Sequence, residues 1–203
     1  MDADQRQLVE RFLAHLRLER HLSPHTVKSY RRDLTCATAY CEDRGIENWR
    51  DLASHDVRAF AARGHARGLS PRSIQRRLSG LRSFLNYLVR ENLLRTNPAV
   101  GISAPKVGRN LPNTLDIEQM GRLLAIPGDD PVSTRDRAML ELFYSSGLRL
   151  AELVNLAPAD VDLDDGVVRV TGKGRKERLV PVGRKASAAL HAWIPLRDEL
   201  ALA

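Results

Sequence analysis

Two short motifs in the second half of the chain carry the side chains with the clearest potential for chemistry. The first covers residues 146–153 and places Arg149 two residues after Gly147, at the expected start of a helix. The second covers residues 171–178 and places Lys173 between two glycines. A guanidinium stays charged and can hold two phosphate oxygens at once, and a lysine close to a ligand can donate a proton to a leaving oxygen. Together the two cations suit a phosphodiester reaction, in which negative charge grows on phosphate and leaving oxygens.

Each of these residues also has an ordinary structural interpretation. Arg149 could pair with Glu152, three residues on, in a surface contact that contributes little to stability. Lys173 could be a solvated lysine at the tip of a hairpin. Tyr144, the last tyrosine of the chain, follows Phe143 on an apolar helical stripe, so we expect it to be a core residue rather than a nucleophile.

The positive charge is concentrated in the first half of the chain. Residues 1–100 hold 18 Lys and Arg against 11 Asp and Glu, whereas residues 101–203 hold 14 of each. No acidic residue occurs between Asp56 and Glu91. A stretch of one sign repels itself unless a polyanion neutralises it, which favours nucleic-acid binding over a generic basic surface. The candidate DNA-binding residues are Arg58, Arg63, Arg67, Arg72, Arg76, Arg77, Arg82 and Lys106, the last in the linker.

Composition excludes several other classes of protein. No apolar run approaches the ~20 residues of a membrane span, and the acidic start, Met1-Asp2-Ala3-Asp4, is not a secretory signal. Cys36 and Cys41 have neither zinc-site nor disulfide spacing, so we expect buried free thiols in a reducing cytoplasm. We expect no metal, no cofactor, no membrane and no small-molecule substrate.

Apolar spacing predicts four helices in the first half. Two of them begin at Leu-Ser-Pro, at residues 22–24 and 69–71, where serine caps the helix and proline takes its first position. The second of these carries a strong stripe, and Arg72, Arg76 and Arg82 fall off it and should face outward. The stripe is Ile74, Leu78, Leu81, Leu85 and Leu88.

Asn97-Pro98 should end this unit, and the aperiodic residues 99–113 should form a linker. In the second half we expect a helix capped by Thr114, another from about Ser133, and a short one from Arg149. Two β runs around residues 172–174 predict a hairpin, and a last helix over 184–194 should be interrupted by Pro195.

Read in order, these motifs resemble the tyrosine site-specific recombinases of the phage integrase family, and most closely the XerC type. The matching segments are residues 22–26, 97–98, 103–106, 136–141, 147–153 and 172–178. The resemblance implies a mainly α fold with a small β-hairpin or sheet. It implies a helical, SAM-like core-binding domain at 1–98, a linker at 99–113, and the N-terminal part of an α/β catalytic domain at 114–203, which together clamp duplex DNA.

The resemblance also implies roles. Arg149 would stabilise the pentacovalent phosphate, Lys173 would protonate the 5′ oxygen, and Glu152 would support them. The complete enzyme would cut and rejoin DNA through a 3′-phosphotyrosine, without metal or nucleotide. It would act in a tetramer with a XerD-like partner recombinase and resolve chromosome dimers before cell division.

The family also needs a His-x-x-Arg pair, a later His or Trp, and a tyrosine nucleophile, which would all lie after residue 203. His55 and Arg58 fit the His-x-x-Arg spacing but fall in the first domain, so we interpret them as a coincidence. The resemblance therefore predicts a recombinase without roughly its last third, which would not cleave DNA alone. A non-catalytic DNA-binding protein and a phage or transposon integrase are the alternative functions.

Overall fold

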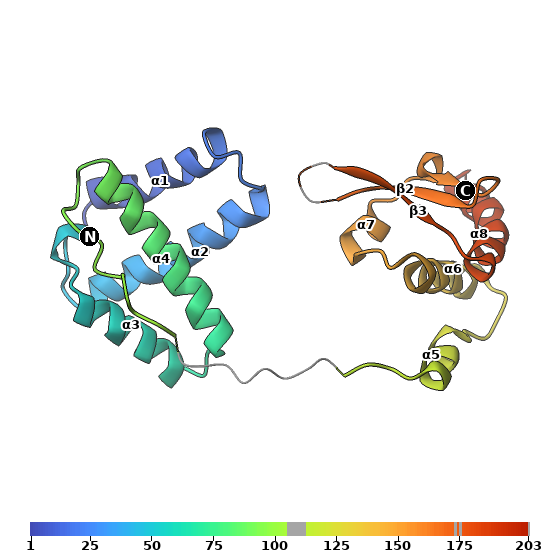
Figure 1. The fold of residues 1–203 in the computed structure, drawn as a ribbon, viewed down its shortest axis with the longest axis horizontal. Coiled ribbons are helices and arrows are strands. Elements are labelled where there is room, and N and C mark those ends of the chain that lie inside the picture. The colour runs from blue at the N-terminus through green and yellow to red at the C-terminus, as the bar shows by residue number, and fades with distance from the viewer. Residues whose placement is uncertain (105–112, 173, 175, 203) are drawn as a thin grey trace. The chain divides into compact units, whose positions relative to one another are not determined.

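The computed structural model describes residues 1–104, 113–172, 174 and 176–202. The chain divides into two compact units, Met1–Asn110 and Leu111–Ala203, and each is described by itself (Figure 1). The first is all helical and the second adds a small antiparallel sheet to its helices, so the predicted fold class is confirmed. No helix in the described ranges is long and apolar enough to cross a bilayer.

The described part of the first unit contains four α-helices. They are α1 (Ala3–Leu18), α2 (Pro24–Asp43), α3 (Ser54–Ala66) and α4 (Pro71–Arg90), with a short 3-10 turn, η1 (Trp49–Asp51), between α2 and α3. The serine caps are present as predicted: Ser23 accepts from the backbone N–H of Thr26, and Ser70 accepts from that of Ser73. Each cap satisfies a backbone donor that a helix start would otherwise leave unpaired.

An aromatic cluster and the α4 stripe form the core of this unit. All five residues of the predicted stripe are at most 2% exposed, and each such side chain contributes about 1.5–3 kcal/mol relative to an exposed one. The rings of Phe12 and Trp49 lie 5.5 and 4.9 Å from that of Phe84. Trp49 also donates from its indole N–H to the carbonyl of Gln5, at 3.0 Å, which ties η1 to α1.

The chain stays attached to the first unit beyond Asn97-Pro98. Ala99 and Ile102 are buried in its core. Arg82 donates from Nε to the Ala99 carbonyl (3.2 Å) and from Nη2 to the Ile102 carbonyl (2.8 Å). The described start of the predicted linker, residues 99–104, therefore packs against α4, and most of the remainder lies outside the described residues.

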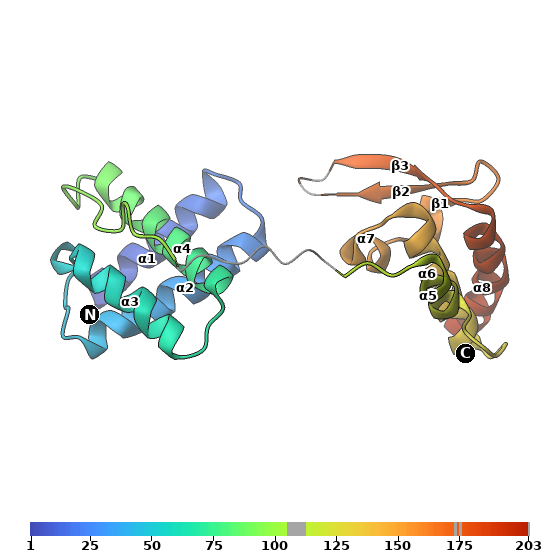
Figure 2. The same ribbon diagram turned by 60° about the horizontal axis from the view of Figure 1, so that its bottom comes forward.

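The second unit packs helices against one face of a three-stranded sheet (Figure 2). The strands β1 (Val161–Asp162), β2 (Val167–Thr171) and β3 (Glu177–Pro181) lie in the order β1-β2-β3, all antiparallel. Val168 pairs with Val180 and Thr171 with Glu177, which confirms the predicted hairpin. The helices are α5 (Ile117–Leu124), α6 (Pro131–Ser146), α7 (Leu150–Val154) and α8 (Arg184–Leu202).

Three helix boundaries in this unit differ from the prediction. Asp116 rather than Thr114 caps α5, and α6 begins at Pro131 after the cap Asp130. The helix α8 does not stop before Pro195 but continues to Leu202. Ala186 and Leu190 bury α8 against α6 and the sheet, and Trp193 and Ile194 pack beside them. Tertiary packing supplies most of a helix's stability in proteins, so it holds α8 together where the local proline signal alone predicted a break.

The two cysteines differ in burial. Cys41 is buried, and burial raises the pKa of its thiol to about 12, so the thiol stays protonated at neutral pH. Cys36 is only half-buried, and both cysteines are free.

Candidate active site

Arg149 stands at the junction of α6 and α7. Gly147 ends α6 in the left-handed conformation, with φ of 56°, a conformation that glycine adopts without steric cost. Leu148 then turns into the core, and Arg149 becomes the N-cap of α7 with its side chain 74% exposed. The glycine break predicted from the sequence thus presents an arginine to solvent at a helix start.

Glu152, in the first turn of α7, holds Arg149 in two ways. Its Oε2 accepts from the backbone N–H of Arg149 at 2.9 Å, and its Oε1 accepts from Arg149 Nη1 at 3.0 Å. The Glu152 side chain is only 4% exposed. The Arg149–Glu152 pair, which the sequence analysis gave as the ordinary structural interpretation, is therefore present. Its carboxylate, however, lies inside the protein rather than on a solvated surface.

Arg178, on β3, completes the cluster and was given no role by sequence reasoning. Its Nη1 and Nη2 donate to Oε1 and Oε2 of Glu152, both at 2.8 Å, which is a bidentate pair. These bonds, followed by the backbone N–H of Arg149, lower the pKa of Glu152 to about 2. The same carboxylate raises the pKa of Arg178. The sequence signalled a role for Arg178 only through its place in the matched segment 172–178. Since 26 residues separate it from Glu152, no local pattern could have predicted their contact.

Gly172, directly after β2, lies against this cluster. The N–H of Gly172 donates to the carbonyl of Lys176 at 2.8 Å and closes the base of the turn. A Cβ at Gly172 would lie 3.3 Å from Arg178 Nη1 and 3.5 Å from Glu152 Oε1, so a side chain there would crowd the ion pair. Lys173 itself lies outside the described residues. The turn that carries it is nevertheless joined to the Arg149 helix through Arg178 and Glu152.

This arrangement can hold an anion. Within the described part of the chain, only Nη1 of Arg149 has an acceptor, Glu152, so Nε and Nη2 are available to a phosphate. Glu152 keeps the guanidinium of Arg149 in place. The negative charge of Glu152 is balanced mainly by Arg178. No group of three or more His, Cys, Asp or Glu among the described residues could hold a metal ion.

Tyr144 is not a core residue, contrary to the prediction. It is 56% exposed, and Phe143 beside it is 36% exposed. The residues of α6 that face the core are Ala138 and Leu142. Two positions along an α-helix rotate a side chain by about 200°, which places Tyr144 opposite Leu142. The sequence interpretation was therefore wrong to place Tyr144 on the core-facing side of α6.

The predicted DNA-binding arginines fall into two groups. Arg58, Arg67 and Arg72 are exposed, and none of them has a hydrogen bond or ion pair to a described residue. Arg77 is half-buried, and its Nε has no partner among these residues. Lys106 lies outside the described residues.

The second group is engaged within the protein, contrary to the outward orientation expected for Arg76 and Arg82. Arg76 pairs with Asp33, whose side chain is 2% exposed, and burial raises the pKa of that carboxyl despite the arginine. Arg63 pairs with Asp43 at 2.6 Å, and Arg82 binds the two carbonyls described above. The positive charge of the stretch between Asp56 and Glu91 is therefore partly balanced by Asp33 and Asp43 of α2. Counting acids within the stretch itself had missed these partners.

Sequence profiles of one family match both units. Residues 9–92 match the phage integrase N-terminal SAM-like domain, and residues 113–201 match the phage integrase family. Among curated proteins, the chain is 51% identical over 185 residues to tyrosine recombinase XerC of Xanthomonas campestris pv. campestris strain B100. It is 47% identical over 190 residues to tyrosine recombinase XerC of Shigella dysenteriae serotype 1. These alignments include 91% and 94% of this chain but only 58% and 64% of the two relatives.

Solved structures show the same fold at lower identity. The Tn1549 transposon integrase in complex with a circular intermediate DNA has a TM-score of 0.70 at 20% identity, over 90% of this chain and 63% of that one. A lambda integrase tetramer bound to a Holliday junction has a TM-score of 0.71 at 17% identity, over 93% of this chain and 57% of that one.

Proposed function

The chain belongs to the phage integrase family of tyrosine recombinases, and from this premise we propose that it acts on duplex DNA as part of a XerC-like site-specific recombinase. The two curated relatives described above are XerC proteins at 47–51% identity, which favours a chromosomal Xer role over a phage or transposon integrase. By the same likeness, its partner is a XerD-like recombinase in a tetramer, and its task is to resolve chromosome dimers in the cytoplasm.

In this proposal the first unit supplies DNA binding. Arg58, Arg67 and Arg72 are the phosphate contacts that the structure favours, because they are exposed and engage no acid among the described residues. Arg63, Arg76 and Arg82 are proposed to shape the unit instead, because their guanidinium groups already have partners inside it. Phosphate contacts of this kind give affinity that falls steeply with salt.

In the second unit, Arg149 is proposed to hold the scissile phosphate and to stabilise the charge that grows on it in the transition state. Lys173 is proposed to protonate the leaving 5′ oxygen. Glu152 and Arg178 are proposed to position both, since the first binds Arg149 and the second lies at the base of the Lys173 turn. The Arg149-Glu152-Arg178 cluster is the single observation that supports this assignment most strongly.

These 203 residues contain no tyrosine after Tyr144. We therefore propose that this polypeptide binds a recombination site without cleaving it, and that the tyrosine of the family reaction stands in a segment aligned with the remaining length of the XerC relatives. The alternative is a protein whose whole role is to occupy such a site.

A nicked suicide substrate tests the proposal. The polypeptide should bind it with strong salt dependence, and a version extended by the corresponding segment of a XerC relative should form a covalent protein–DNA adduct. If the extended version bound but formed no adduct, the non-catalytic alternative would be favoured. If neither version bound duplex DNA, the proposed function would be wrong.

A further inference from the structure

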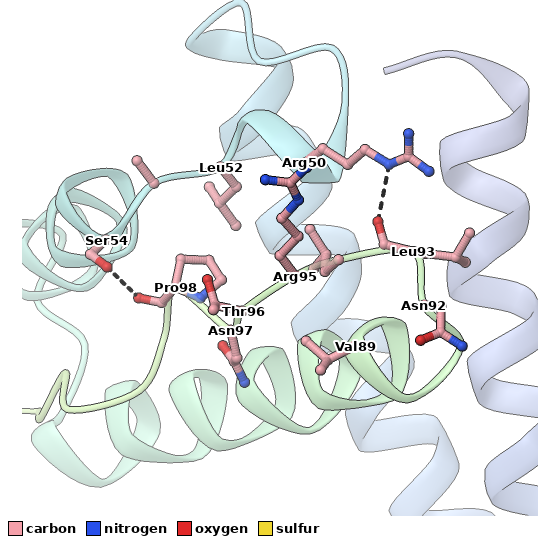
Figure 3. A pocket seen from close by; sticks show the side chains of 12 residues that line it. Arg50, Leu52, Ser54, Val89, Asn92, Leu93, Arg95, Thr96, Asn97 and Pro98 are labelled. Atoms are coloured by element: carbon pink, nitrogen blue, oxygen red, sulfur yellow. Dashed lines mark hydrogen bonds between the residues drawn. The ribbon is translucent and has the colours of Figure 1, made fainter.

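The first unit has a large hollow that the proposed DNA and phosphate chemistry does not use. It lies between η1 with the start of α3 on one side and the end of α4 with residues 91–98 on the other, and it has a volume of about 960 Å³ (Figure 3). A single phosphate ion is far smaller than this space. The hollow is thus sized for a chain segment or a larger ligand.

The lining of the hollow is positively charged. Its charged side chains are Arg50 and Arg95, and none of the described residues that line it is acidic. Figure 3 shows Arg95 extending from the segment after α4 toward the turn that carries Arg50. Arg50 donates from Nε to the Leu93 carbonyl at 3.0 Å, which orients its guanidinium and leaves both Nη groups for a ligand. Arg95 is exposed and has no partner in the described part of the chain.

Both polar and apolar side chains line the hollow beside these two arginines. Asn92 and Thr96 offer hydrogen-bonding groups, and Leu52 and Val89 offer apolar surface. A carboxylate suits the free edge of a guanidinium, with which it forms two parallel hydrogen bonds, and an aliphatic side chain suits the apolar wall. An acidic peptide with interspersed apolar residues combines both properties.

The hollow lies near the opposite end of α4 from one proposed phosphate contact, Arg72, so it is not part of that contact. Val89 lines it, whereas the proposed phosphate contact Arg72 lies seventeen residues earlier, near the start of the same helix. At ~1.5 Å per residue, α4 separates the two by about 25 Å. We propose that this hollow, the Arg50–Arg95 site, docks an acidic peptide segment of a protein partner.

A binding assay with a defined peptide tests this inference on the whole 203-residue chain. The probe is a fluorescein-labelled, end-blocked hexapeptide of glutamate and leucine, and the control probe carries glutamine in place of glutamate. The chain should raise the polarisation of the acidic probe and not that of the glutamine probe. The substitutions Arg50→Glu and Arg95→Glu together should weaken binding roughly tenfold or more, which corresponds to at least about 1.4 kcal/mol.

Matched variants distinguish binding at the Arg50–Arg95 site from a general effect of net charge. Arg11→Glu with Arg17→Glu makes the same change in net charge at two exposed positions of α1 and should leave affinity for the peptide unchanged. Arg95→Ala should weaken binding without affecting folding, because Arg95 has no partner among the described residues, and circular dichroism checks this. An unaffected Arg50→Glu, Arg95→Glu variant, equal binding of the glutamine probe or no binding at all would each overturn the inference.

Competition with DNA tests whether DNA, rather than an acidic peptide, occupies the hollow. A duplex carrying a recombination site should not displace the peptide, and the Arg50→Glu, Arg95→Glu variant should bind that duplex as the unchanged chain does. Displacement by equimolar duplex would identify the hollow as part of the DNA interface and overturn the peptide assignment. A chain that bound the peptide but no DNA would contradict the proposed function alone.

Discussion

Replacing Arg58, Arg67 and Arg72 together by alanine should remove DNA affinity without removing stability. All three side chains are exposed and engage no described residue, so their loss disturbs no contact inside the first unit. Each phosphate contact adds about 0.9 to the slope of log K against log salt concentration, so the triple variant should lose a slope of about 2.7. When salt rises from about 50 to 200 mM, the loss of DNA affinity should therefore be about 40-fold smaller for the triple variant than for the unchanged chain.

The engaged arginines should behave in the opposite way. Arg76→Ala leaves Asp33 buried without its partner, and because Arg76 is itself 39% exposed we expect a cost of about 1–3 kcal/mol, below that of a fully buried pair. Arg82→Ala removes the donors to the Ala99 and Ile102 carbonyls, at a similar cost of about 1–3 kcal/mol. Both variants should keep most of the salt slope at a temperature where they remain folded.

Fluorescence anisotropy with a labelled duplex over a salt series measures the slopes, and urea unfolding followed by circular dichroism measures the stabilities. Arg11, Arg17 and Arg20 provide a control triple, because they are exposed and their replacement makes the same change in net charge. The division of the arginines is wrong if the first triple variant keeps the full slope. It is equally wrong if Arg76→Ala or Arg82→Ala lowers the slope as much as the triple while stability stays unchanged.

Four further predictions concern the site and the domains. The 203-residue polypeptide should form no covalent adduct on a nicked recombination site, with or without a partner subunit, as judged on denaturing gels; a trapped adduct would return the exposed Tyr144 to consideration. In an extended, cleavage-competent version, Arg149→Ala should abolish cleavage but leave binding in gel shifts nearly intact, and Lys173→Ala should slow cleavage of a normal 5′ oxygen far more than that of a 5′-thio leaving group, which needs no proton. Because the folded-state pKa of Glu152 is lowered from 4.5 to about 2, its contribution to stability is present above pH 4.5 and lost as pH falls toward 2; Glu152→Gln should therefore flatten this part of the pH profile of unfolding, and an unchanged profile would contradict the ion-pair cluster. Limited proteolysis with mass spectrometry should cut first within the linker predicted at 99–113 and leave α1–α4 intact, and early loss of α1–α4 would contradict an independent first unit.

The local signals in the sequence were sufficient for most helices and for the hairpin. The serine-proline starts of α2 and α4 and the glycine break before Arg149 each act within a few residues, so the sequence alone specifies them. The α4 stripe was predicted for a similar reason, because a strict helical period leaves one face to bury.

The errors arose where a partner lies far away in the sequence. Arg76 and Arg63 were assigned to DNA because their acids, Asp33 and Asp43, belong to another helix. The contact of Arg178 with Glu152 joins a strand to a helix, and no pattern within either segment encodes it. Tyr144 was placed on the wrong face because α6 has only a weak apolar period, and α8 passes through Pro195 because packing outweighs local propensity.

Each compact unit contains one of the two tryptophans of the chain. Trp49 lies in the aromatic cluster of the first unit at 1% exposure, and Trp193 is half-buried against the core of the second. An indole in a dry core emits at shorter wavelength than one in contact with water. The chain thus carries an intrinsic fluorescent reporter in each unit, and Trp193→Phe leaves only the signal of the helical unit. A comparison of emission from this variant with that of the unchanged chain would follow the unfolding of each unit separately, with no added label.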